Sequence, residues 1–86
     1  MEAKPKFSVE GKTYPSGIKG VEVNTTFDIM HDEPFHSIIE SIDGVESIIW
    51  AHRYNFTAYV GAMFDPHEVA RVMAHKIDAY ILQTIK

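Results

Sequence analysis

Residues 43 to 66 read DGVESIIWAHRYNFTAYVGAMFDP. Two strand-like runs, residues 46–52 and 56–64, are separated by a short polar segment at residues 53–55. A separation of this length is typical of a β-hairpin. A glycine that can end a helix precedes the hairpin, and an Asp-Pro pair that can begin one follows it. We therefore predict that the hairpin lies in the middle of a sheet, with one helix before it and one after it.

The segment upstream of the hairpin predicts two further strands. Phe7 and Val9 are spaced as in a strand within residues 6–14, and a Tyr-Pro-Ser-Gly loop signal follows them. Residues 21–29 then alternate between apolar and polar side chains without a break. This period of two predicts a half-buried strand whose polar face meets water.

Both helices are indicated by capping residues and apolar spacing. Asp32 is a candidate N-cap for the first helix, Pro34 fits its first turn, and Gly44 is placed to end it. For the second helix, Asp65 is the predicted cap, and an apolar stripe runs from the Pro after it towards the end of the chain. The apolar positions of the first helix are Phe35, Ile38, Ile39 and Ile42.

This order of elements, ββαββα, predicts an α+β fold. In so short a chain it favours a two-layer sandwich, with a mostly antiparallel sheet and both helices on one face. A length of 86 residues suits a single domain spanning residues 1–86.

Composition narrows the classes of function. The chain contains no cysteine, which excludes disulfides and thiolate metal sites, and we predict no cofactor. Its net charge is −4 and its basic residues are scattered, so we expect no nucleic-acid binding. It shows neither a long apolar run nor a secretory signal, which predicts a cytoplasmic protein that does not bind membranes.

The first strand of the hairpin has apolar residues on both of its faces. Ile48 and Trp50 share one face, and Ile49 and Ala51 share the other, so apolar groups remain uncovered whichever face meets the helices. Exposed apolar area of this kind marks interfaces. We predict a protein partner or a homodimer here; alternatively, the N-terminal strand pair or its loop covers this face. The predicted interface comprises Ile49, Trp50, Tyr59 and Met63, with Arg53 and Tyr54 at its rim.

The histidines suggest an alternative function, binding of a metal or a small ligand. The candidate ligands are His31, Asp32, His36 and His52. His31 and His36 are not spaced as i and i+3 or i+4, so the other interpretation is a polar helix entrance with an aspartate cap. The hairpin tip, with a His-Arg-Tyr run, is either an anion site or a solvated turn. No nucleophile elbow, phosphate loop or acid–base pair is recognisable, which predicts a protein that is not an enzyme.

Several of these segments resemble the N-terminal domain of Nfu/NifU-type iron–sulfur scaffold proteins. The similar positions are Pro34-Phe35, Ile38-Ile39, the run from Ile42 to Ile48, the run from Asn55 to Val60, and Tyr80-Ile81. Lys6-Phe7, Gly11, Tyr14 and Ser16-Gly17 also match positions upstream.

This sequence departs from that family in two ways. It lacks the Asn-Pro-Asn segment that usually precedes the Lys-Phe pair, and it lacks the Cys-x-x-Cys of the separate cluster-holding module. The resemblance therefore implies an accessory interaction domain in iron–sulfur assembly, not a scaffold that holds a cluster through thiolates. A Gly-Val-x-x-Ile signature is also similar to heavy-metal-associated ferredoxin-like domains, but only their fold is implied, because their metal-binding cysteines are missing here.

Overall fold

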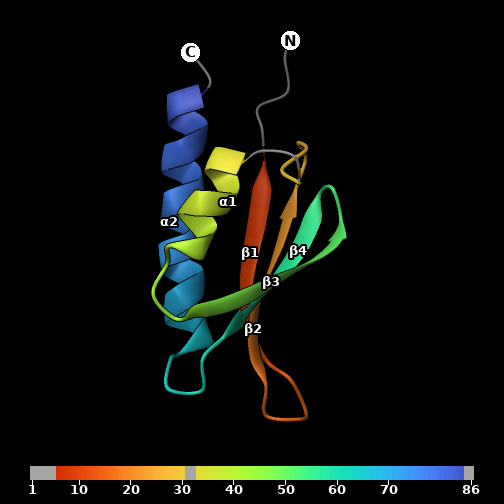
Figure 1. Ribbon diagram of the computed structural model, residues 1–86, viewed down its shortest axis with the longest axis vertical. Helices are drawn as coiled ribbons and strands as arrows, with labels where there is room; N and C mark the ends of the chain where they lie inside the picture. Colours follow the sequence, from red (N-terminus) through yellow and green to blue (C-terminus); the bar gives the residue numbers. More distant parts are fainter. Residues whose placement is uncertain (1–5, 31–32, 85–86) are drawn as a thin grey trace.

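The computed structural model describes residues 6–30 and 33–84. Four strands and two helices follow one another as ββαββα (Figure 1), which confirms the predicted α+β class and element order. The elements are β1 (Phe7–Thr13), β2 (Lys19–Thr25), α1 (Glu33–Glu40), β3 (Val45–His52), β4 (Asn55–Val60) and α2 (Pro66–Thr84).

The strands form one antiparallel sheet in the order β1-β2-β4-β3. Two hairpins, β1–β2 and β3–β4, are joined along β2 and β4, where Val21 faces Ala58 and Val23 faces Phe56. The hairpin of residues 45–60 therefore supplies one central strand, β4, and one edge strand, β3. β1 is the opposite edge.

Both helices lie on the same side of the sheet (Figure 1), as predicted. α2 packs over β1 and β2, whereas α1 packs on β3 and against α2. Each helix thus covers the hairpin that belongs to the other half of the chain.

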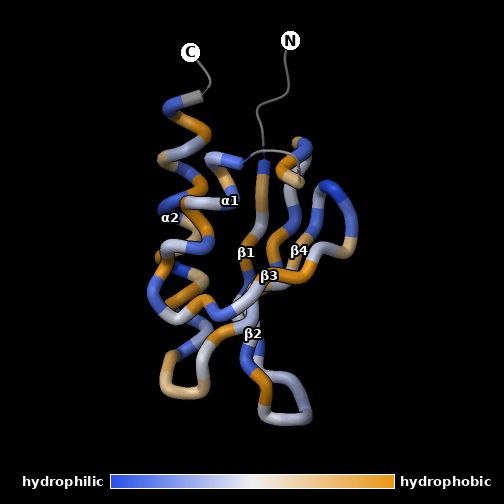
Figure 2. Tube along the Cα trace, viewed as in Figure 1, coloured by the Kyte–Doolittle hydropathy of each residue, from blue (hydrophilic) through white to orange (hydrophobic). Residues whose placement is uncertain are grey.

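The core lies between the helices and the sheet, where Figure 2 shows hydrophobic positions on both layers. Phe56 on β4 is its centre, because its ring meets Phe35 of α1 edge-on at 6.2 Å between centroids and Trp50 of β3 at 4.9 Å. The buried hydrophobic residues are Val21, Val23, Ile29, Phe35, Ile39, Ile42, Phe56, Ala58, Val60, Val69, Ala70, Met73 and Ile77.

Three predicted boundaries differ from the structure. β2 ends at Thr25 instead of continuing to residue 29, because the Thr25 hydroxyl donates to the Phe27 carbonyl oxygen at 2.6 Å and bends the chain. Ile29 is nevertheless buried, from the loop. α1 ends at Glu40, and Gly44 adopts its positive φ of 98° in the turn that follows. The predicted N-cap Asp32 lies outside the described residues.

The third boundary is the end of β4. This strand stops at Val60, and a turn follows in which the Phe64 amide donates to the Gly61 carbonyl oxygen at 3.0 Å. α2 then begins at Pro66 as predicted, and the His67 amide donates to the Asp65 carboxylate at 2.9 Å. Asp65 is therefore confirmed as the cap of α2.

Candidate functional site

The outer edge of β3 carries backbone groups without a strand partner. Among the described residues β3 pairs only with β4, and no backbone hydrogen bond to any other element involves residues 46–52. Its pairing with β4 is irregular between Val45 and Ser47 and again between Trp50 and His52. The regular part, Ser47 to Trp50, contains no charged side chain. Unpaired N–H and C=O groups of this kind are a template for another strand.

The side chains of β3 alternate between the two faces of the sheet. Ile48 and Trp50 face the helices and pack against the core, opposite Ala58 and Phe56 of β4. Ile49 points to the other face, which we call the open face, and its side chain is 55% exposed. Trp50 was predicted as an interface residue together with Ile49, and this needs correction: the Trp50 ring packs against the core beneath α1, and Ile49 remains on the open face.

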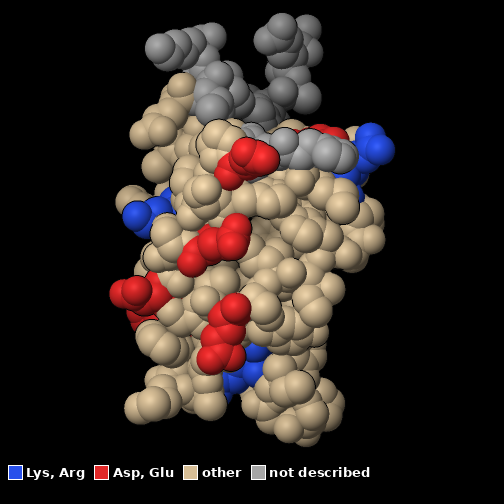
Figure 3. All heavy atoms as spheres, viewed as in Figure 1, with Lys and Arg blue, Asp and Glu red and all other residues tan. Residues whose placement is uncertain are grey.

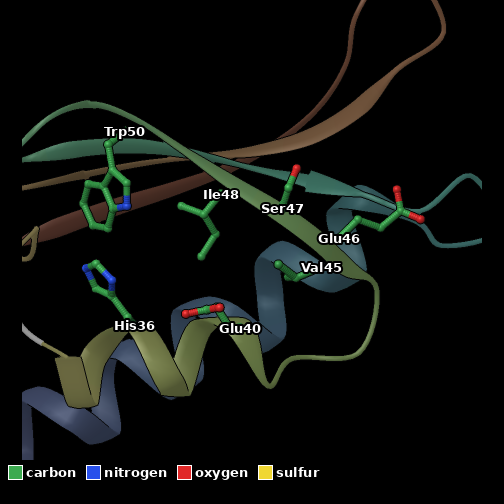
Figure 4. Close-up of a pocket in the computed structure, with 7 residues that line it drawn as sticks. All are labelled: His36, Glu40, Val45, Glu46, Ser47, Ile48 and Trp50. Carbon is green, nitrogen blue, oxygen red and sulfur yellow. The ribbon is translucent and has the colours of Figure 1, made fainter.

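Trp50 is held by aromatic contacts on the helix side. The His36 ring of α1 stacks on it with 4.8 Å between centroids and 21° between planes (Figure 4). His36 is fixed in turn because its Nε2 lies 3.1 Å from the Ile29 carbonyl oxygen, to which it donates. This stack ties α1 and the loop before it to the edge strand.

A groove of about 250 Å³ runs between α1 and β3 beside this stack. The Glu40 carboxylate of α1 points into it, whereas the side chain of Glu46 on β3 extends away from it towards Gly61 (Figure 4). Neither carboxylate forms an ion pair with any residue in the described ranges. The remaining lining residues are His36, Val45, Ser47, Ile48 and Trp50. Among the described residues, Glu40 therefore places an unpaired negative charge on the helix side of the β3 edge, and Glu46 places a second one at the start of the strand.

The structure separates the other predicted interface residues. Tyr59 lies on the open face, half-buried, two strands from β1. Met63 is 96% exposed but belongs to the hydrophobic loop between β4 and α2 (Figure 2), not to the sheet face on which it was predicted. Arg53 and Tyr54 form the hairpin tip beyond β3, where the Arg53 Nε lies 4.0 Å from a carboxylate oxygen of Asp28.

The β1–β2 half of the open face carries an ordered polar cluster. Lys12 lies 3.0 Å from the Glu22 carboxylate and 3.2 Å from that of Glu10. The Tyr14 hydroxyl donates to Glu22 at 2.9 Å, and its ring lies over Gly20. The N-terminal hairpin thus extends the sheet, and its loop borders the open face through Tyr14 and through residues 16–18, which line a pocket together with Tyr59.

The hydrogen bonds and ion pairs in this cluster shift the pKa values of Glu22, Lys12 and Tyr14. The ammonium of Lys12 and then the hydroxyl of Tyr14 hold the pKa of Glu22 below its usual range. The bond to Glu22 raises the pKa of Lys12. Burial, followed by the bond to Glu22, raises the pKa of Tyr14. The cluster is therefore most stable when Glu22 is ionised while Lys12 and Tyr14 keep their protons.

We expect the variant Glu22→Gln to be less stable than the unaltered protein by about 1 kcal/mol at neutral pH. Because folding lowers the pKa of Glu22, its stabilisation is present above the usual glutamate range and disappears as the pH falls through the folded value. Urea denaturation at several pH values is expected to show the two proteins converging below about pH 5. Glu40→Gln, at an unpaired carboxylate, serves as the control. A constant difference across this range would contradict the assignment.

The candidate metal ligands do not come together in the described part of the chain. His31 and Asp32 lie outside the described residues. His36 uses Nε2 on the Ile29 carbonyl, and the Nδ1 of His52 accepts from the Tyr54 amide at 3.1 Å. Within residues 6–30 and 33–84 no three His, Asp or Glu side chains are grouped as metal ligands. Metal binding by the predicted set stays a prediction.

Sequence reasoning found the strand but missed the groove beside it. The groove could not be predicted, because no spacing rule relates a helix position such as Glu40 to a position on a later strand. The available signal for an exposed strand was that residues 46–52 carry apolar side chains on both faces. The Tyr14–Glu22 bond carried no signal, because it depends on the hairpin register.

Comparison with known proteins adds no relative to these observations. A scan against models of protein families and searches of curated proteins and of solved structures found no match. In the described part of the chain, neither helix combines the length and apolar character needed to cross a bilayer.

Proposed function

We propose that this chain is a small non-catalytic interaction domain that binds a protein partner along the edge of β3. The observation that carries this proposal is an eight-residue edge strand whose centre is uncharged and whose outer backbone groups have no partner among residues 6–30 and 33–84. Ile49 adds exposed apolar area at the middle of the strand. Backbone hydrogen bonds would supply affinity, and alternate side chains would supply selectivity.

The other edge of the sheet lacks these properties. β1 presents Glu10 and Lys12 on the open face, where they form an ion pair. On the helix side Gly11 lies directly against the backbone of Pro66 at the start of α2. Charged side chains and a covering helix are the usual protection of an edge strand against pairing. The contrast favours β3 as the binding edge.

The resemblance to Nfu/NifU N-terminal domains supports a narrower proposal, that the partner belongs to iron–sulfur cluster assembly. The positions that carry the resemblance fall in α1, in the turn and strand that follow it, in β4 and near the end of α2. A domain without cysteine would then act as an accessory that contacts the scaffold and leaves cluster ligation to other chains.

Replacing Ile49 with Lys is expected to abolish partner binding while the fold is kept. The side chain is already exposed, so the free energy of unfolding is expected to change by no more than about 0.5 kcal/mol. A lysine at the middle of an edge strand opposes further pairing. The measurement is affinity capture from the native host with immobilised protein, compared band by band between the unaltered chain and Ile49→Lys.

The matched control is Leu82→Lys, because Leu82 is also an exposed apolar residue, 71% accessible, but lies on α2. Proteins retained by the unaltered chain and by Leu82→Lys, and lost with Ile49→Lys, would support binding at β3. Retention of the same proteins by a folded Ile49→Lys would contradict it.

A further inference from the structure

The charge around β3 points to the kind of partner. Resting on the function proposed above, we infer that β3 accepts a basic extended segment of another protein, added as a fifth strand, and not a second copy of this chain.

Negative charge borders the edge on its helix side. The Glu40 carboxylate lies in the groove between α1 and β3, and the Glu46 carboxylate lies beside Gly61 at the start of β3. Neither forms an ion pair within the described residues. Figure 3, which looks onto α1 and β3, shows acidic side chains spread along this side, with a basic side chain just below the lowest of them and further Lys and Arg at the margins. A strand that carries Lys or Arg on this side would neutralise charge that the chain itself leaves unpaired.

The same charge opposes pairing between two copies. If two β3 strands paired antiparallel around a two-fold axis, both α1 helices would lie on the same face of the joint sheet. Both copies would then present Glu40 on that shared face, and each chain carries a net charge of −4. Two chains of like net charge repel each other, which disfavours a homodimer along this edge.

The two faces of β3 favour different side chains in the incoming strand. On the helix side the strand would run beside the groove and its Glu40 carboxylate, next to Ile48 and Trp50. On the open face it would run beside Ile49, which is exposed and apolar. Because side chains alternate along a strand, a segment with basic residues at every second position and apolar residues between them meets both requirements.

A short synthetic peptide that alternates Lys and Val tests this inference. We expect titration into isotope-labelled full-length protein to shift the backbone amide resonances of residues 46–51, and the shifts to weaken as salt is added. A peptide of the same length with Glu in place of Lys is expected to bind at least about tenfold more weakly. A Lys-Val peptide methylated at alternate backbone nitrogens is expected not to bind, because it cannot form the strand ladder.

Charge variants of the protein provide the second measurement. The double variant Glu40→Gln, Glu46→Gln is expected to weaken binding of the Lys-Val peptide about fivefold at low salt. The matched control, Asp78→Asn on α2, alters an exposed carboxylate of the helix over β1 and β2 and is expected to leave the affinity unchanged. An equal loss in both variants would overturn the role assigned to the groove.

The remaining outcomes separate this inference from the proposed function. If the Glu peptide binds at residues 46–51 as tightly as the Lys peptide, the preference for a basic partner is overturned while binding at the edge stands. If neither peptide shifts these residues, both the inference and the proposed function fail. Sedimentation velocity is expected to show a monomer, and a dimer that Ile49→Lys dissociates would assign the edge to a second copy.

Discussion

Replacing Phe56 with Ala is expected to lower the free energy of unfolding by about 3–5 kcal/mol, the largest effect of any single substitution considered for this chain. Phe56 is fully buried on the central strand β4. Its ring joins Phe35 of α1 to Trp50 of the edge strand. Truncation would leave a cavity at the point where both layers meet. Urea or guanidinium denaturation measures the loss directly.

The control for this substitution is Ile49→Ala on the neighbouring strand. Ile49 also carries a large apolar side chain, but it lies on the open face and is mostly exposed. We expect its truncation to cost less than about 1 kcal/mol. Similar losses at the two positions would contradict the assignment of the core to the helix side of the sheet.

Replacing Gly11 with Ala is expected to destabilise the protein by about 1–3 kcal/mol, although only one methyl group is added. A Cβ at this position would lie 2.6 Å from the Pro66 carbonyl oxygen and 2.9 Å from the His67 nitrogen. These are backbone atoms at the first turn of α2, so a side-chain rotation cannot relieve the overlap. The start of α2 would have to move away from β1. Thermal or chemical denaturation of the purified variant measures the cost.

Ser8→Ala on the same strand is the matched control, because Ser8 is exposed and lies on the open face opposite Asn24. We expect no loss above about 0.5 kcal/mol there. If Gly11→Ala were equally well tolerated, the close approach of β1 to α2 would be wrong.

Elements with strong local signals were predictable from the sequence. Asp65 and Pro66 identify the start of α2 because cap chemistry depends on neighbouring residues alone. The β3–β4 hairpin follows from two apolar runs separated by a short polar segment, and the structure shortens that segment to Arg53 and Tyr54. The α+β class then follows from the order of the elements.

Features that depend on distant parts of the chain were not predictable. Residues 21–29 alternate as one strand, yet Thr25 bonds to the Phe27 carbonyl and to the hairpin tip, and the strand ends there. The face on which Trp50 lies was left open, because both faces of β3 carry apolar groups. In the structure the Trp50 ring lies on the helix side of the sheet, where it stacks on the His36 ring of α1. Alternation within one strand cannot reveal such a contact.

The candidate site was predictable in part for the same reason. Ile49 was predicted to be exposed because its strand carries apolar residues on both faces and the helices cover only one of them. It is exposed in the structure. Met63 was selected on the assumption that β4 continues to residue 64, and the turn at Gly61 removes it from the sheet. Whether β3 lies at an edge depends on the strand order, which periodicity does not specify.

Each helix packs on strands from the other half of the chain, and this arrangement affects how the protein folds. A nascent or cleaved segment containing only β1, β2 and α1 would lack α2, the helix that packs over its own strands. The second half would lack α1, which packs on β3. We therefore expect that neither half folds alone, and that the chain folds in one cooperative step that depends on contacts between residues far apart in sequence.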